Sequence, residues 1–77
     1  MSRNHIEQCV RDSLCAYFDD LNGARPSDIY DMIIRCVEKP MLETVLEKSE
    51  GNQSIAASYL GINRNTLRKK LQEHGLL

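Results

Sequence analysis

Four basic side chains stand close together near the end of this 77-residue chain: Arg64, Arg68, Lys69 and Lys70. Guanidinium and ammonium groups bind phosphate oxygens, and a guanidinium group also fits the O6 and N7 edge of guanine. The segment that contains them, GNQSIAASYLGINRNTLRKKL at 51–71, therefore has the residue types needed to bind duplex nucleic acid. The alternative interpretation of such a charge run is a solvated helix face.

The charge of the chain is unevenly divided. Ten Lys and Arg residues against eleven Asp and Glu residues give a formal charge of −1. Residues 51–77 hold four basic residues and one acidic residue, a charge of +3, whereas residues 1–50 hold six and ten, a charge of −4. This asymmetry indicates an acidic body and a separate end that binds anions.

The apolar residues around the basic run predict two short helices joined by a tight turn. Asn52 is a candidate N-cap for a helix over 53–60. Gly61 permits the turn, and Asn63 is a candidate N-cap for a second helix that runs to about His74. The predicted inward positions are Ala56, Ala57, Leu60, Ile62, Leu67 and Leu71. This arrangement is typical of a helix-turn-helix motif, although a plain helical hairpin can share its spacing.

The second of these helices has its polar residues opposite Leu67 and Leu71, because successive residues are about 100° apart around a helix. Arg64, in the first turn, is best placed to reach a guanine edge, and Asn63 either contacts a base or only caps the helix. The residues suited to phosphate contact are Arg68, Lys69 and Lys70, with Asn52 and Ser54 as either phosphate contacts or plain caps.

Two long helices are predicted in the acidic half, residues 1–50. The first covers about 4–21, with Asn4 as a candidate N-cap and apolar residues at steps of three and four. The dipeptide Asn22-Gly23 is predicted to close it.

The second long helix is predicted over about 28–49, with Ser27 as cap and Asp28 and Asp31 in its first turn. Pro40 is predicted to kink it, with a break into two helices as the alternative. Its apolar residues occupy more than one face, so a single partner helix cannot cover them. A second copy of the chain would do so, and a small chain has little interior of its own.

Other functional classes find little support in the sequence. It has no Gly-rich phosphate loop, metal-ligand cluster or nucleophile motif, so no enzyme, cofactor or small-molecule substrate is predicted. Cys9, Cys15 and Cys36 are predicted to be reduced core residues, and the aromatic residues are predicted to pack in or near the core. His74 is predicted to interact with a helix dipole or a phosphate. Without a signal peptide or a membrane span, a complete cytoplasmic protein is expected.

The chain resembles the Fis family of small bacterial nucleoid proteins. The resemblance covers nearly the whole chain from about residue 11 and rests on five short segments. They are GINRNTLRKKL, GNQ at 51–53, LNG at 21–23, RDS at 11–13 and VEKP at 37–40. The C-terminal segment is also similar to the DNA-binding end of NtrC-type activators, which lack the LNG and VEKP segments.

This resemblance implies an all-α fold in which two helices of each subunit form an intertwined dimeric bundle, followed by a C-terminal helix-turn-helix. It implies a homodimer in the nucleoid that binds and bends double-stranded DNA and reads DNA shape more than bases. Asn63 and Arg64 would contact bases. The residues that would contact the DNA backbone are Asn52, Ser54, Thr66, Arg68, Lys69 and Lys70. RNA polymerase is a further candidate partner.

The chain also departs from the family. The mobile N-terminal arm through which Fis activates site-specific invertases has no counterpart, so that activity is not expected. Basic residues of the best-known Fis are absent at Glu50, Ile55, Gln72 and Glu73, so fewer flanking DNA contacts, a weaker bend and a shallower salt dependence are expected. The competing hypothesis is a helical protein-interaction module whose basic helix binds an acidic protein.

Overall fold

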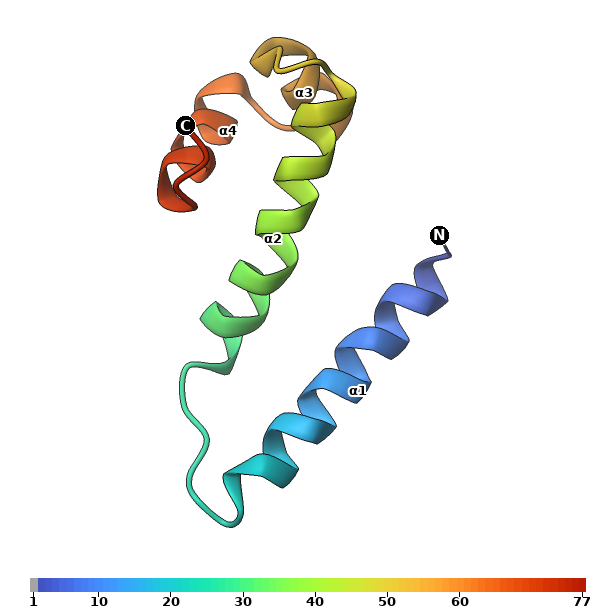
Figure 1. Cartoon of the computed structure of the whole chain (residues 1–77), viewed down its shortest axis with the longest axis vertical. Coiled ribbons are helices and arrows are strands. Elements are labelled where there is room, and N and C mark those ends of the chain that lie inside the picture. Colours follow the sequence, from blue (N-terminus) through green and yellow to red (C-terminus); the bar gives the residue numbers. More distant parts are fainter. Residues whose placement is uncertain (1) are drawn as a thin grey trace. The chain divides into compact units, whose positions relative to one another are not determined.

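The computed structural model describes residues 2–77 and contains four α-helices in this range (Figure 1). Their bounds are Arg3–Leu21 (α1), Ile29–Lys48 (α2), Gln53–Leu60 (α3) and Arg64–Glu73 (α4). The described residues form no strand, so the predicted all-α class with four helices is confirmed. The chain divides into two compact units, residues 1–33 and 34–77, and the division falls within α2.

α1 begins one residue earlier than predicted and has a different cap. The backbone of Ser2 is extended (ψ 153°), and its side chain accepts a hydrogen bond from the backbone N–H of His5 at 3.2 Å. The prediction that Asn4 caps this helix was wrong, because Asn4 already lies inside it. At the other end Asn22 adopts the left-handed conformation (φ 52°), which a short polar side chain tolerates.

α2 begins at Ile29, and Ser27 is not its cap. Asp28 precedes the helix with φ 55°, and its carbonyl accepts a hydrogen bond from the N–H of Met32 at 3.1 Å. Asp28 is therefore outside the first turn, while Asp31 lies in it as predicted. The helix continues without interruption through Pro40, so the predicted alternative of two separate helices is not observed.

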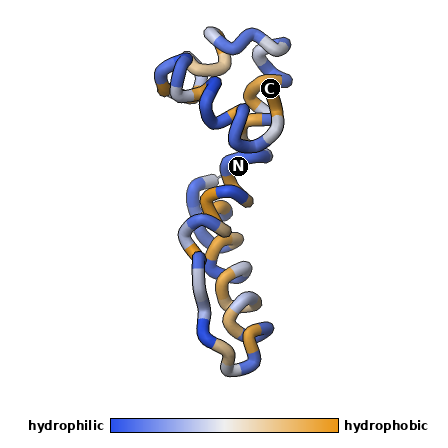
Figure 2. Tube along the Cα trace, turned by 90° about the vertical axis from the view of Figure 1, so that its left-hand side faces the viewer, coloured by the Kyte–Doolittle hydropathy of each residue, from blue (hydrophilic) through white to orange (hydrophobic). Residues whose placement is uncertain are grey.

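The first unit, residues 1–33, has no buried residue among those described. Ile6, Phe18 and Tyr30 are 47%, 49% and 77% exposed. The main contacts are local: the Tyr17 hydroxyl donates to the carbonyl of Ser27 at 3.3 Å, and the Tyr17 and Phe18 rings meet edge to face. Apolar positions recur along α1, as the orange segments of Figure 2 show, and the chain leaves them in contact with solvent.

Two predictions about individual residues are not met within a single chain. Cys9, Cys15 and Cys36 were expected in the core, but all three are exposed free thiols. Phe18, Tyr30 and Tyr59 are also exposed rather than packed in a core. Among the described residues, these side chains lie on helix faces that stay in contact with solvent.

The second unit, residues 34–77, has a small apolar core to which α2, α3 and α4 all contribute. The buried members are Leu42, Ala56, Ala57, Leu67 and Leu71, each at most 4% exposed. The half-buried side chains around them are Val45, Leu46, Leu60, Ile62 and Leu76. All six inward positions predicted for the last third of the chain belong to this core, so that prediction is confirmed.

Residues 2–77 lack two features that would indicate other functions. None of the helices in this range combines the length and hydropathy that a transmembrane span requires. No cluster of three or more His, Cys, Asp or Glu side chains in the same range is placed to hold a metal ion.

Candidate nucleic-acid interface

α3 and α4 pack against each other across a turn formed by residues 61–63. Gly61 is left-handed (φ 75°), and its N–H donates to the carbonyl of Ser58 at 3.2 Å. The N–H of Ile62 donates to the carbonyl of Ala57 at 3.1 Å. These two bonds form a Schellman motif, in which glycine takes the left-handed position because it has no Cβ. The chain therefore turns sharply within three residues, which brings the start of α4 close to α3.

Each helix of this pair begins with an asparagine cap. The Asn52 side-chain oxygen accepts a hydrogen bond from the N–H of Ile55 at 3.1 Å, and that of Asn63 accepts from the N–H of Asn65 at 2.7 Å. Both predicted caps are confirmed. The side-chain amide nitrogen of each asparagine is a donor, so capping leaves these residues able to donate to a phosphate or base oxygen.

Most of the predicted contact residues lie on the surface of the α3–α4 pair. The exposed ones are Asn52, Ser54, Asn63, Arg64, Thr66, Arg68 and Lys69. The Arg64 guanidinium donates through Nη1 to the Ser54 hydroxyl at 3.3 Å. The structure thus joins the first residue of α4 to the first turn of α3, although the two residues are ten positions apart in the sequence.

Lys70 has different surroundings from its basic neighbours. Its side chain is 35% exposed, and its Nζ lies 2.8 Å from Oε2 of Glu38 in α2. The His74 ring, 4% exposed, places Nε2 at 2.9 Å from Oε1 of the same carboxylate. His74, the C-cap residue of α4, thus has a carboxylate partner that the sequence did not predict. We call these three residues the Glu38 cluster.

Sequence reasoning missed the Glu38 cluster. Glu38 is 32 residues from Lys70 and 36 from His74, so no local spacing relates them. The only available signal was that Lys70 and His74 are four residues apart and so share a helix face.

The cluster changes the acidity of Glu38. The hydrogen bond from Lys70, followed by that from His74, lowers the pKa of the Glu38 carboxyl from its ordinary value of 4.5, and partial burial opposes this only in part. The charged form of Glu38 is therefore favoured in the folded protein.

This lowered pKa predicts an acid-dependent loss of stability. The stabilisation from Glu38 is complete above its unfolded-state pKa of 4.5 and disappears as the pH falls through the lower pKa of the folded state. Glu38→Gln is expected to lower the free energy of unfolding at neutral pH by about 1 to 3 kcal/mol, because it removes a charge-assisted pair. It should also flatten the fall in stability below about pH 4.5. Urea unfolding over a pH series measures both effects.

Glu47→Gln is the matched control, because Glu47 is an exposed carboxylate on the same helix. It should change neither the free energy of unfolding at neutral pH nor the fall in that free energy below about pH 4.5. If Glu38→Gln and the wild-type chain lost stability in parallel on acidification, the assignment would be wrong.

These elements define a class of protein. A short α3, a glycine turn and a basic α4, held by a core of small and branched apolar residues, form a helix-turn-helix protein. Residues 33–74, more than half of the chain, match the family described as "Bacterial regulatory protein, Fis family". The chain belongs to the Fis family.

Similar proteins occur in several bacteria. A protein named as a Fis-like DNA-binding protein in Ralstonia nicotianae is 65% identical over 77 residues, which is the full length of both chains. One of the same description in Neisseria meningitidis serogroup A is 58% identical over 72 residues, covering 94% of this chain and 91% of the relative. A DNA-binding protein Fis of Vibrio atlanticus is 40% identical over 76 residues, covering 99% of this chain and 78% of the relative.

Proposed function

We propose that this chain is a homodimeric DNA-binding and DNA-bending regulator of the nucleoid, in the bacterial cytoplasm, that tolerates many sequences. The observation that carries the proposal is the exposed polar face of the α3–α4 pair. Arg64 lies at its leading end, 3.3 Å from Ser54, and Arg68 and Lys69 follow on the exposed surface of the same helix. The names of the relatives, which describe DNA-binding proteins, support the same proposal.

Two residues are proposed to read bases. Arg64 stands in the first turn of α4, the part of a recognition helix that enters the major groove, and its guanidinium suits the O6 and N7 atoms of guanine. Asn63, next to it, retains a side-chain N–H₂ group while its oxygen caps α4.

A second set is proposed to hold the DNA backbone without reading sequence. Arg68 and Lys69 supply exposed positive charge, and Thr66 supplies a hydroxyl on the same helix. Asn52 and Ser54, at the start of α3, combine side-chain donors with the partial positive charge of a helix N-terminus.

A second copy of the chain is proposed to complete the fold. α1 has no buried residue, and several large apolar side chains of α1 and of the first part of α2 face solvent in a single chain. They are Ile6, Phe18, Ile34, Val37 and Met41. An apolar surface of this extent is unfavourable in water, and a symmetric pairing of two copies removes it. A folded monomer in a sedimentation experiment would contradict this part of the proposal.

DNA bending is proposed because the base-reading set is small. With only two residues assigned to base edges on each subunit, most discrimination has to come from how readily a DNA site deforms. A dimer that presents two recognition helices to neighbouring major grooves would prefer a central segment whose minor groove narrows easily, as A/T-rich DNA does.

A gel-shift series tests the function directly. Two duplexes differing only in an A/T-rich or a G/C-rich central spacer are titrated with the protein at low and at moderate salt. The expected result is tighter binding to the A/T-rich duplex and weaker binding of both at higher salt, with a slope of about −0.9 in log–log form per phosphate neutralised. Equal affinity for the two spacers would exclude shape readout. No binding to either would favour the protein-interaction alternative.

A further inference from the structure

Three basic residues follow one another near the middle of α4, but they do not share one environment. Arg68 and Lys69 are exposed, whereas Lys70 is half-buried against α2. Because neighbouring residues point about 100° apart around a helix, the Lys69 and Lys70 side chains leave α4 in different directions. The basic run is therefore not a uniform positive surface.

The direction of Lys70 is set by the Glu38 cluster. The two oxygens of the Glu38 carboxylate are each bonded to a different residue of the C-terminal part of the chain, Oε2 to Lys70 and Oε1 to His74. Leu71, between them in the sequence, is fully buried in the core of the second unit. Polar and apolar contacts thus hold the same stretch of α4 against α2.

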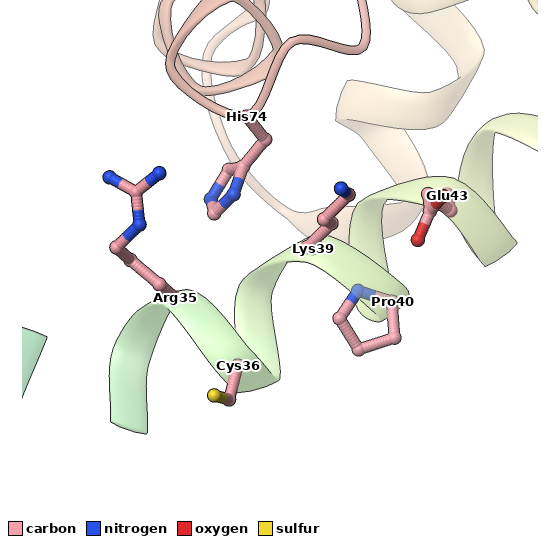
Figure 3. A pocket seen from close by; sticks show the side chains of 6 residues that line it. All are labelled: Arg35, Cys36, Lys39, Pro40, Glu43 and His74. Carbon is pink, nitrogen blue, oxygen red and sulfur yellow. The ribbon is translucent and has the colours of Figure 1, made fainter. Parts of the chain in front are cut away.

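Separating Lys70 from this cluster would be costly. The Glu38 side chain is only 15% exposed, and a carboxylate with so little contact with water loses much stabilisation when a partner is removed. His74 bonds the other oxygen of this carboxylate, so both oxygens have protein partners. The same ring also faces a groove lined by Arg35, Lys39 and Glu43 (Figure 3). Lys70 therefore gains little by leaving Glu38 for a DNA phosphate.

We infer that Glu38 is a positioning residue for the recognition helix, and that it neutralises Lys70 within the protein, so that Lys70 adds no charge to the DNA-binding surface. Arg68 and Lys69 are then the basic residues of α4 that contact DNA phosphates, and Lys70 is not one of them. The inference rests on the proposed DNA binding. It reduces the basic residues of α4 that contact the DNA backbone from three to two.

The salt dependence of DNA affinity tests this inference. Lys69→Gln and Lys70→Gln form a matched pair, because each removes one positive charge from adjacent positions of α4. Lys69→Gln is expected to make the log–log salt slope shallower by about 0.9 for each phosphate that the lysine neutralises in the wild-type complex. Lys70→Gln is expected to leave the slope unchanged. A reduction by Lys70→Gln as large as that by Lys69→Gln would overturn the inference.

Glu38→Gln gives the reverse test. In this variant no carboxylate charge offsets the positive charge of Lys70. The log–log salt slope of DNA affinity is therefore expected to become steeper. The double variant Glu38→Gln, Lys70→Gln should return to the wild-type slope. A merely structural role for Glu38 predicts no change in slope. Wild-type protein that bound no duplex DNA would overturn the proposed function and this inference together.

A measurement on the wild-type chain covers the case in which a variant fails to fold. The NMR signals of the Lys69 and Lys70 ε-methylene groups are followed as duplex DNA is added. The Lys69 signal is expected to shift on binding, and the Lys70 signal is expected to keep its position from the DNA-free protein. Equal shifts of the two signals would contradict the inference without any substitution.

Discussion

Arg64→Ala is expected to remove the part of the sequence preference that comes from direct contact with a guanine edge, while leaving general DNA binding and the preference for an A/T-rich centre in place. A bidentate contact from a guanidinium group to guanine contributes about 1 to 3 kcal/mol of discrimination. Its loss should reduce the ratio of specific to non-specific affinity by roughly 5-fold to 150-fold. The fold should survive, because the Arg64 side chain is exposed and its 3.3 Å hydrogen bond to Ser54 lies on the surface.

The structure offers a matched control for this change. Arg68 is the same residue type on the same helix, four positions further on, and is proposed to contact phosphate. Arg68→Ala should weaken specific and non-specific sites by similar factors and make the salt slope shallower. Competition titrations with a specific and a scrambled duplex separate the two effects.

The outcome for Arg64 also tests the orientation of α4. If Arg64→Ala left the affinity ratio unchanged while Arg68→Ala reduced it, base reading would reside further along the helix than proposed. The Ser54 hydroxyl would then hold Arg64 for a backbone contact instead. Ser54→Ala, which removes only that hydroxyl, would show whether the hydrogen bond matters for specificity.

Leu67→Ala is expected to cause the largest loss of stability. Leu67 is fully buried between α4 and its neighbours, in a core with only five buried apolar side chains among the described residues. Truncation of a buried leucine lowers the free energy of unfolding by about 2 to 5 kcal/mol, through lost transfer free energy and the cavity left behind. In a core this small few side chains can move to fill the cavity, so we expect a value in the upper part of that range.

The control for this change is Leu77→Ala, because Leu77 is the same residue type and 55% exposed. It should change the free energy of unfolding by less than about 0.5 kcal/mol. Thermal and urea unfolding followed by circular dichroism measure both variants. Leu67→Ala with near wild-type stability would mean that the α3–α4 pair does not depend on this core.

Local signals predicted the helix-turn-helix well. Asn52, Gly61 and Asn63 act through hydrogen bonds to residues within four positions, so cap and turn chemistry can be predicted from neighbouring residues. The same reasoning was less successful at the start of α1. It placed the N-cap at Asn4, whereas the structure has it two residues earlier, at Ser2.

Burial in the first half was predicted poorly for a different reason. The apolar residues of α1 and of the first part of α2 were recognised correctly as a hydrophobic pattern, but a pattern does not say which surface covers it. Cys9, Phe18 and Tyr30 remain exposed in one chain, which is the same observation that supports a second copy. The spacing of apolar residues shows which face of a helix is apolar, but it does not show whether the same chain or a second copy packs on that face.

Short-range patterns were enough to predict the four helices, the caps and turn of the C-terminal pair, and the exposed positions of Arg64, Arg68 and Lys69 on α4. These features depend on side chains that act within a few residues of their own position. The pairing of Lys70 and His74 with Glu38, and that of Arg64 with Ser54, became visible only in the folded chain. Such pairings depend on the packing of helices that are far apart in the chain, and packing assigned different roles to adjacent residues of the same charge.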